Sequence, residues 1–353
     1  MDALIEVAAH RLKGDVAAAL APFADAGRAR GIEAEDADLA ARWIVQAERL
    51  GLTGFGVDML LRDLAHVSGS GPGAPATRDA RDAAADPATG RESAVDAGAT
   101  GSGAIDGIDA TGAPGPLALA AAVRIAAAST AAHGIGLVGV RNVGALGVLG
   151  LAARSLAEAG AVALVSAQAP AMVAPWGGSS PAIGTNPLAF AAPRTGGSPL
   201  VADFATSRIT LAELRRRREA GEPLPEGVAL DAQGRPTVAA DAAAALLPEG
   251  RLGSLTGLLV EVIAGAAVGG RAPSGEAAAG RGAVIIAFDP ARAGGSGIAE
   301  TCAEIAAEWR AAGGHVPGRF DALPQGHEDL EGAVALTQHQ YDALLARGAE
   351  GAS

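Results

Sequence analysis

Apolar residues recur at helical spacing along the first 66 residues of the chain. The segments LIEVAAHRLK, EAEDADLAARWIVQAERLG and VDMLLRDLAHV place their large apolar side chains three or four positions apart, which is the spacing of one helix face. The pattern predicts an N-terminal helical region over residues 1–67. Its opening, MDALIEVAAHRLKGD, is expected to be an amphipathic helix and not a signal peptide, because acids lie near its start.

The helical pattern stops at residue 68. Residues 68–103 read SGSGPGAPATRDARDAAADPATGRESAVDAGATGSG, a stretch with no aromatic residue and almost no large aliphatic one. Such a composition cannot bury enough apolar surface to offset the entropy that is lost on ordering. We therefore expect a disordered insertion here.

Helix-like and strand-like segments alternate from residue 104 onward. LALAAAVRIAAASTAAHG is typical of a helix that ends at a glycine, and the IGLVGV that follows is typical of a strand. LGVLGLAARSLAEAG and AVALVSAQ repeat this order. The pattern predicts an α/β domain over residues 104–320. Residues 321–353 form a C-terminal segment with a helix, which we expect to pack back on the N-terminal region.

Composition narrows the class of protein. The chain has 353 residues and a net charge of −12, so a nucleic-acid surface is not expected. Alanine supplies most of its apolar content, and no run of about 18 large apolar residues suggests a membrane span. Cys302 is the only cysteine, which excludes an internal disulfide and a cysteine-based metal cluster. A soluble cytoplasmic protein without a metal site is the expectation.

Two motifs suggest phosphate or dinucleotide binding and are set aside. GIGLVG, from Gly134 to Gly139, matches GxGxxG literally, but the Rossmann fingerprint needs a strand before the glycines and a helix after them. Here the expected order is reversed. The run from Arg215 to Arg218 lies in a helix flanked by acids, so a solvated face is the better interpretation.

The order of several phrases resembles the malate/L-lactate dehydrogenase-like oxidoreductases. The phrases are GIGLVGVRN, PAMVAPWGGSSPAIGTNPLAFAAP, VADFATS, LVEVIAG and IIAFDP, and GTNPLAFAAP followed by DFATS is the specific pair. That family also includes ureidoglycolate, sulfolactate and piperideine-2-carboxylate enzymes. The resemblance implies a non-Rossmann NAD(P)-binding fold with a mixed sheet and an intertwined homodimer. It also implies hydride transfer involving a small 2-hydroxy, 2-oxo or 2-imino acid, with NAD and NADP both left open.

The resemblance also implies a set of cofactor-binding residues. The GTNP turn could present backbone N–H groups, with Gly184 at positive φ and Asn186 bonding its own backbone. Asp203, Ala205 and Ser207 would form a small-residue surface on one side of an extended segment. A buried structural turn is the alternative for both. The whole set is Gly144, Ala145, Leu146, Gly184, Thr185, Asn186, Asp203, Phe204, Ala205, Ser207, Gly326 and His327.

The positions that the resemblance makes catalytic hold no reactive side chain. Ala145 stands where the family has a histidine, and Gly54 and Phe55 fall on its serine and second histidine. Met59 falls on the arginine that would bind the substrate carboxylate, and Leu252 falls on a lysine. The catalytic residues are therefore unknown. Arg141, Asn142 and Met59 are the candidate substrate residues, and His66 and His327 are histidines that could reach the site or merely lie exposed.

Two functions remain open from the sequence. The first is an NAD(P)-dependent oxidoreductase with an altered active site. The second is a catalytically inactive homologue that binds cofactor or assists assembly and keeps the dimer fold. Loss of a general acid lowers a rate by about 10² to 10⁴. The apolar residues Phe55, Met59 and Ala145 therefore favour the inactive homologue, whereas membership of a dehydrogenase family would favour the enzyme.

Overall fold

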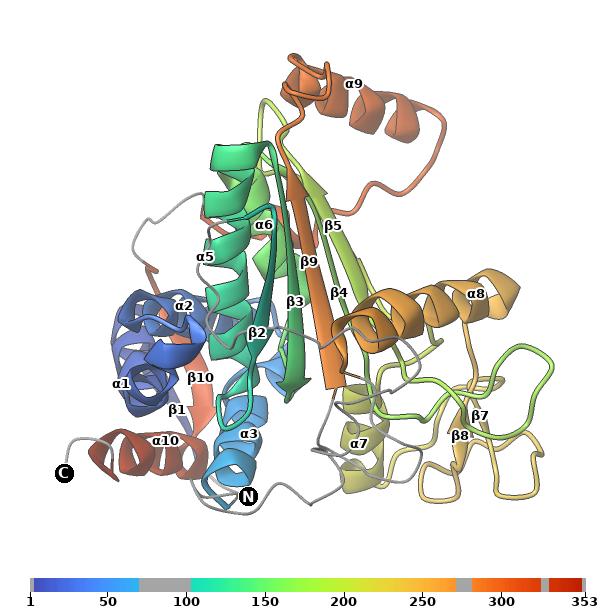
Figure 1. The fold of residues 1–353 in the computed structure, drawn as a ribbon. Helices are drawn as coiled ribbons and strands as arrows, with labels where there is room; N and C mark the ends of the chain where they lie inside the picture. Colours follow the sequence, from blue (N-terminus) through green and yellow to red (C-terminus); the bar gives the residue numbers. More distant parts are fainter. Residues whose placement is uncertain (1–2, 70–102, 271–280, 325–329, 351–353) are drawn as a thin grey trace, which may run out of the picture.

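A mixed six-stranded sheet forms the centre of the molecule (Figure 1). The computed structural model describes residues 3–69, 103–270, 281–324 and 330–350. The strand order is β2-β3-β9-β4-β5-β6, with β2 parallel to β3 and all other neighbours antiparallel. The strands are β2 (Ile105–Asp109), β3 (Ile135–Val143), β4 (Val162–Ala167), β5 (Leu188–Ala192), β6 (Leu200–Phe204) and β9 (Arg281–Phe288). The predicted α/β class and mixed sheet are confirmed.

Two helices cover one face of this sheet, α5 (Gly115–His133) and α6 (Leu149–Glu158) (Figure 1). Alanines and leucines on most sides of α5 let it lie buried between the sheet and the N-terminal helices. The helix ends at Gly134, whose φ of 85° is the left-handed cap conformation that favours glycine. Helix α5 thus precedes the GIGLVG motif and strand β3 follows it, which is the predicted order and not that of a Rossmann fingerprint.

The two ends of the described chain pack together. Helices α1 (Ala9–Gly27), α2 (Ala34–Arg49) and α3 (Val57–Gly69) form the N-terminal part, and α10 (Gln338–Glu350) packs against α1. The expected helix at the start is wrong for its first residues, because Leu4–Ala8 forms strand β1. This strand pairs antiparallel with β10 (Ala333–Thr337). Val7 faces the core while Leu4 is exposed, which is the alternation of a strand.

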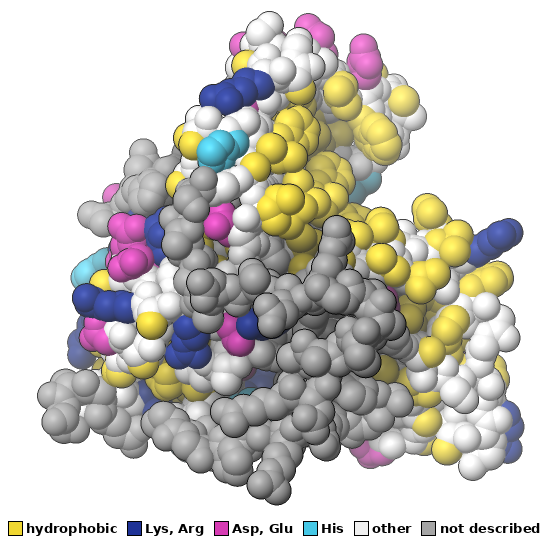
Figure 2. All heavy atoms as spheres, in the orientation of Figure 1, with side chains coloured by type: hydrophobic (Ala, Val, Ile, Leu, Met, Phe, Trp, Pro, Cys, Tyr) yellow, Lys and Arg dark blue, Asp and Glu magenta, His cyan; other side chains and the backbone are white. Residues whose placement is uncertain are grey.

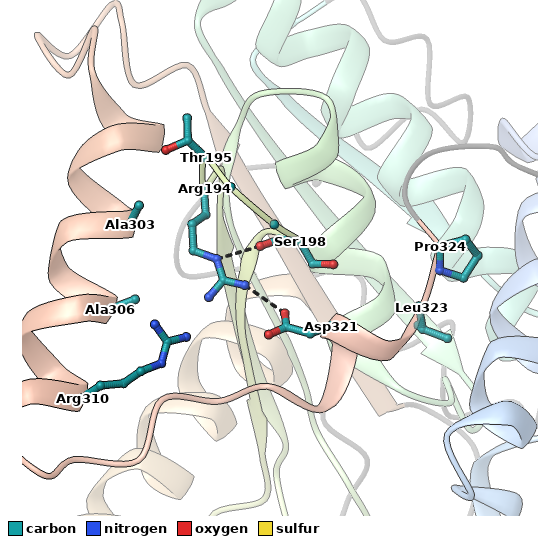
Figure 3. A pocket seen from close by; sticks show the side chains of 11 residues that line it. Arg194, Thr195, Ser198, Ala303, Ala306, Arg310, Asp321, Leu323 and Pro324 are labelled. Atoms are coloured by element: carbon teal, nitrogen blue, oxygen red, sulfur yellow. Dashed lines mark hydrogen bonds and ion pairs between the residues drawn. The ribbon is translucent and has the colours of Figure 1, made fainter.

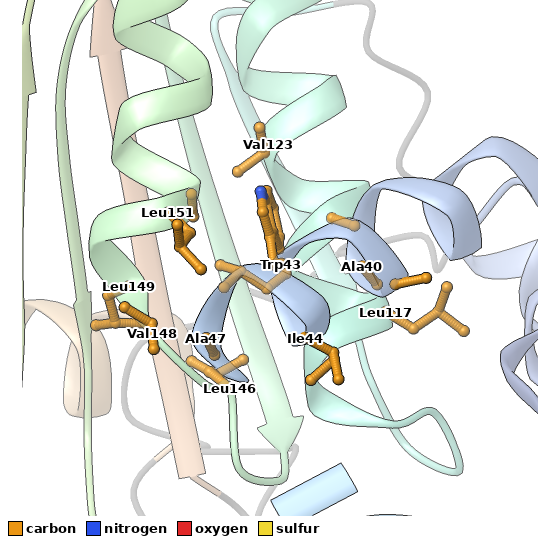
Figure 4. Close-up of a cluster of buried hydrophobic side chains, with 14 of the residues drawn as sticks. Ala40, Trp43, Ile44, Ala47, Leu117, Val123, Leu146, Val148, Leu149 and Leu151 are labelled. Atoms are coloured by element: carbon orange, nitrogen blue, oxygen red, sulfur yellow. The ribbon is translucent and has the colours of Figure 1, made fainter. Parts of the chain in front are cut away.

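The main hydrophobic core joins the N-terminal helices to the sheet. Trp43 of α2 lies among apolar side chains from α5 and α6, including Val123 and Leu151 (Figure 4). Its indole N–H donates to Ser155 Oγ at 3.2 Å, so the ring is buried with its polar atom satisfied.

The remaining elements lie at the two ends of the sheet, with the last of them at the end opposite the others (Figure 1). They are α7 (Leu211–Ala220), β7 (Ala229–Leu230), β8 (Ala245–Leu246), α8 (Gly250–Val260) and α9 (Ile298–Ala311). Helix α8 continues into a π-helical turn, Glu261–Gly265, and a 3-10 turn, Ala266–Val268.

Two helical segments among the described residues are long and apolar enough to span a membrane by composition. The segment Gly115–His133 is 72% buried, as expected of a core helix in a globular protein. The segment Gly250–Val268 is 33% buried and leaves an apolar face uncovered. Residues 70–102, which hold nearly all of the expected insertion, lie outside the described residues, as do Gly326 and His327.

Candidate active site

The segments that the sequence singled out lie together at one edge of the sheet, where the ends of its strands meet. Strands β3, β4 and β6 end at this edge, and β5 and β9 begin there. Thr206 donates its backbone N–H to Thr185 O at 3.0 Å, and Gly150 donates its N–H to Asp203 Oδ2 at 2.7 Å. The GTNP turn, the DFATS segment and the loop that leads into α6 are therefore neighbours.

The GTNP turn is held by contacts inside the protein. Gly184 N–H donates to Glu261 Oε1 at 3.2 Å, and Asn186 Nδ2 donates to the same oxygen at 3.0 Å. Asn186 Oδ1 accepts from Ala169 N–H, and the Asn186 side chain is fully buried. The sequence had suggested that Asn186 bonds its own backbone. Its side chain instead bonds Ala169 and Glu261 in other segments.

The expectation of positive φ at Gly184 is also wrong. The left-handed residue is Asn186, at φ 34°. Position 184 excludes a side chain for a different reason, because a Cβ there would lie 2.2 Å from Ala169 O. The Gly184 amide and the Asn186 side chain already make hydrogen bonds within the protein. Contacts of Gly184, Thr185 and Asn186 with a cofactor therefore remain a prediction.

The DFATS segment presents less open surface than expected. Ser207 is 6% exposed and its hydroxyl donates to Ile209 O at 2.7 Å. Asp203 and Ala205 are partly accessible, and Phe204 is exposed. Burial raises the pKa of Asp203 to about 6, although the Gly150 N–H and Arg319 oppose the shift. Of the three residues predicted to form a flat surface for the cofactor, only Asp203 and Ala205 are accessible.

Arg141 and Asn142, the candidate substrate residues, both contact one carboxylate. Arg141 Nε lies 3.2 Å from Asp109 Oδ2, and Asn142 Nδ2 donates to Asp109 Oδ1 at 3.0 Å. Burial would raise the pKa of Asp109, but side-chain hydrogen bonds from Asn142 and Thr111 lower it below the usual value. A substrate role for either residue stays a prediction beside this structural one.

Asp63 of α3 organises the loop that carries Gly144 and Ala145. Its Oδ1 accepts from Ala145 N–H at 3.3 Å and its Oδ2 from Gly115 N–H at 2.6 Å. A Cβ at position 144 would lie 2.2 Å from Asp63 Oδ1, so only glycine fits. Burial raises the pKa of Asp63, while the two backbone bonds, Arg281 and His66 lower it.

The apolar positions implied by the resemblance do come together. Phe55 and Met59 both approach Gly147, since a Cβ built there would lie 3.6 Å from Met59 Cε and from Phe55 O. Met59 is buried, and Leu146 and Ala145 belong to the same loop and core. Leu252, in contrast, is strongly exposed on α8.

Sequence analysis missed a set of cationic side chains near this loop. Arg281 starts β9 opposite Val143, and the charges of Asp63 and Arg215 both act on it. Burial lowers the pKa of Arg281 and Arg215 adds to the effect, while Asp63 opposes it. Burial likewise lowers the pKa of Arg215, and Arg62 adds to that shift. We call Arg62, Arg215 and Arg281 the arginine group. Arg215 itself is exposed, as expected for a solvated helix face.

Three buried polar atoms at this edge have no hydrogen-bond partner in the described part of the chain. They are Ser166 Oγ and Gln168 Oε1, at the end of β4, and Arg281 Nε, at the start of β9. Gln168 N–H donates to Gly282 O at 2.9 Å, which places the two strand ends side by side. Unsatisfied buried polar atoms are rare in proteins, and each needs an explanation such as a water, an ion or a catalytic role.

The chain is similar to known oxidoreductases. The sequence profile of the malate/L-lactate dehydrogenase family matches residues 95–338. The (2R)-3-sulfolactate dehydrogenase (NADP(+)) of Chromohalobacter salexigens is 43% identical over 148 residues, which are 38% of this chain and only 44% of that protein. The Δ1-pyrroline-2-carboxylate/Δ1-piperideine-2-carboxylate reductase of Pseudomonas putida is 33% identical over 250 residues, 67% of this chain and 73% of that one.

The fold of this chain matches those of solved structures over nearly its whole length. The Δ1-piperideine-2-carboxylate reductase of Pseudomonas syringae pv. tomato superposes with a TM-score of 0.72 at 25% identity, covering 97% of this chain and 99% of that one. A sulfolactate dehydrogenase from Methanocaldococcus jannaschii shares the fold with a TM-score of 0.68. The order of phrases noted in the sequence is thereby explained: the chain belongs to the malate/L-lactate dehydrogenase family.

Proposed function

We propose that this protein is an NAD(P)-dependent oxidoreductase that reduces a small 2-imino acid. The observation that carries the proposal is the match to cyclic imino acid reductases, which extends over two thirds of the chain in sequence and nearly all of it in structure. Such a reductase draws on the nicotinamide cofactors of the cytoplasm, where we propose that it acts.

The polar atoms at the sheet edge fit a nicotinamide cofactor and an acid. Ser166 Oγ, Gln168 Oε1 and Arg281 Nε supply donors and an acceptor that lack partners in the described residues. When bound, the cofactor supplies the hydride. One relative, the sulfolactate dehydrogenase of Chromohalobacter salexigens, is named for NADP(+), which favours NADPH as the reductant.

The arginine group offers positive charge for a substrate carboxylate. Met59 stands where the resemblance implies an arginine. Arg281 lies near the same loop and is half-buried, and its Nε atom is buried without a hydrogen-bond partner among the described residues. A guanidinium in a partly buried site binds a carboxylate by charge-assisted hydrogen bonds. We propose that Arg281 orients the acid in place of the missing arginine.

Ala145 favours an imine over a ketone. Hydride transfer to a ketone produces an alkoxide, which needs a proton from a general acid as the charge develops. An iminium ion already carries its proton on nitrogen, so hydride addition to carbon gives the neutral amine directly. A site with alanine in place of histidine at position 145 should therefore lose less rate with an iminium ion than with a ketone.

The test compares matched substrates. NADPH consumption by the purified protein is measured with Δ1-piperideine-2-carboxylate and with an open-chain 2-oxo acid of similar size. We expect turnover of the imino acid and a rate lower by about 10² or more for the oxo acid. Arg281→Met should raise KM for the imino acid with a smaller effect on kcat.

Other outcomes contradict the proposal in distinguishable ways. A cofactor-induced rise in Tm without turnover of any acid would support the inactive homologue instead. No rise in Tm with millimolar NADH or NADPH would remove the cofactor assignment itself.

We also propose that the protein forms a homodimer through the sheet face opposite α5 and α6. Leu137, Ile286, Leu164 and Phe190 are consecutive register partners across four strands of that face. Exposed residues of α8, among them Leu255 and Leu258, continue the apolar surface (Figure 2). A contiguous exposed apolar patch of this kind marks an interface, and the intertwined dimer implied by the resemblance makes a second copy the partner.

A further inference from the structure

A cavity lies at the opposite edge of the sheet from the candidate active site. Its volume is about 550 Å³, and its walls are the turn between β5 and β6, one face of α9 and residues 321–324. The turn follows Ala192 and precedes Leu200, whereas the GTNP and DFATS segments lie at the other ends of these strands. Neither the family resemblance nor the proposed function assigns this cavity a role.

Arg194 forms one wall and is held in a fixed orientation. Its side chain is only 8% exposed; Nε donates to Ser198 O at 2.8 Å and Nη2 to Asp321 Oδ1 at 2.9 Å. The guanidinium has a third nitrogen, which is not used in these contacts and which faces Arg310 of α9 across the cavity (Figure 3). Two like charges facing each other are unfavourable unless an anion lies between them.

Helix α9 keeps its acids away from this cavity. Ala303, Ala306 and Arg310 line the cavity, whereas Glu300, Glu304 and Glu308 follow a separate i, i+4, i+8 row and are exposed. The two alanines leave the space open because their side chains are short. Asp321 is the one carboxylate among the lining residues, and it is engaged with Arg194.

We propose that this cavity binds a phosphate group carried by a molecule of nucleotide size. The lining holds two guanidinium groups and one carboxylate, which leaves net positive charge. Thr195 and Ser198 add hydroxyls, and Gly196 and Gly197 let the turn approach a ligand without side chains. Arginine forks match phosphate oxygens in pairs, and the volume lies within the usual range for small-molecule sites.

The phosphate could come from two sources. One is the dinucleotide of the proposed function, through its adenosine 2′-phosphate, and this source rests on that function. The other is a separate phosphorylated metabolite, whose binding does not depend on it.

Titration calorimetry with adenosine 2′,5′-bisphosphate tests the site, with adenosine as the uncharged probe. We expect the bisphosphate to bind and adenosine not to. Arg310→Ala should weaken binding about ten-fold or more, as loss of a charge-assisted bond does. Arg251→Ala removes an exposed arginine from α8 and should leave binding unchanged. Ala303→Leu, which fills the cavity without changing charge, should weaken binding, and Tm checks that each variant folds.

Kinetics then identify the source. If Arg310→Ala raises KM for NADPH but not for NADH, the phosphate belongs to the dinucleotide. If bisphosphate binding falls while KM for NADPH is unchanged, the ligand is a separate metabolite, and either result supports the site. The proposal is overturned if the wild-type protein binds no bisphosphate at millimolar concentration, or if Arg251→Ala weakens binding as much as Arg310→Ala. Retained turnover of imino acid in that case would leave the proposed function standing.

Discussion

At the scale of single residues, Gly184 has little room for a side chain. A Cβ at this position would lie 2.2 Å from Ala169 O and 2.4 Å from Asn186 Oδ1. We expect Gly184→Ala to lower the free energy of unfolding by at least about 2 kcal/mol, because backbone and a buried amide must shift. Gly14→Ala is the control: this glycine lies in α1 with nothing within 4 Å. Alanine there should stabilise by about 0.5–1 kcal/mol, and chemical denaturation measures both variants.

Glu48 makes stability depend on pH. Its carboxylate accepts from Val57 N–H at 2.7 Å in the N-terminal core, and burial raises its pKa from 4.5 to about 7. The folded protein therefore holds this proton more tightly than the unfolded chain. The stability that protonation contributes is complete below pH 4.5 and is lost as pH rises through 7.

Glu48→Gln should remove that loss. The amide oxygen can still accept from Val57, so we expect Tm to rise more at pH 8 than at pH 5, by the equivalent of roughly 3 kcal/mol. Glu304→Gln, on the exposed face of α9, should change Tm little at either pH. Equal shifts of Glu48→Gln at both pH values would show that the carboxyl does not titrate in this way.

Residue roles were predictable where they follow a motif and not where they depend on distant segments. Phe55, Met59 and Ala145 were placed by the order of phrases, and the structure brings their segments together. Asp63 and Arg281 have no motif of their own, and they meet only because α3 packs beneath the end of β3. The position of positive φ in the GTNP turn depends on the buried contacts of Asn186, which local sequence does not specify.

At the scale of elements, long periodic segments were predictable and short terminal ones were not. The runs that form α2, α5 and α6 show clear helical spacing or a glycine stop. LIEVA has five residues, too few to separate a helix turn from a strand by pattern alone. It becomes a strand because β10, far along the chain, supplies its hydrogen-bonding partner.

Two aspartate substitutions test the role of β1. Val7 is 5% exposed and pairs with Val334, whereas Leu4 is 73% exposed on the same strand. We expect Val7→Asp to lower the free energy of unfolding by about 3 kcal/mol, because a charge would be buried without a partner. Leu4→Asp should change it by less than about 0.5 kcal/mol. Similar losses for both would mean that the strand does not pack as described.

At the scale of the whole molecule, the homodimer that we propose would cover the apolar sheet face with a second copy of the chain. We expect a mass of twice 34.4 kDa by light scattering at micromolar concentration. Leu255→Glu combined with Leu258→Glu should shift the protein toward the monomer, because charges placed on a buried apolar interface are costly. Glu304→Gln together with Glu308→Gln on α9 provides a control that should leave the mass unchanged. A wild-type monomer would contradict the dimer proposal but not the fold.

The pairing of β1 with β10 also sets the order in which the chain can complete its structure on the ribosome. Strand β1 is made long before β10, and in the described chain β10 is its only strand partner. At a synthesis rate of about 5–20 residues per second, roughly 16 to 65 s separate the two strands. Throughout that interval β1 lacks its strand partner, and an unpaired strand edge can pair with another chain. The β1–β10 ladder can therefore form only after residues 333–337 have been made, and until then the N-terminal helices lack the contacts that it brings.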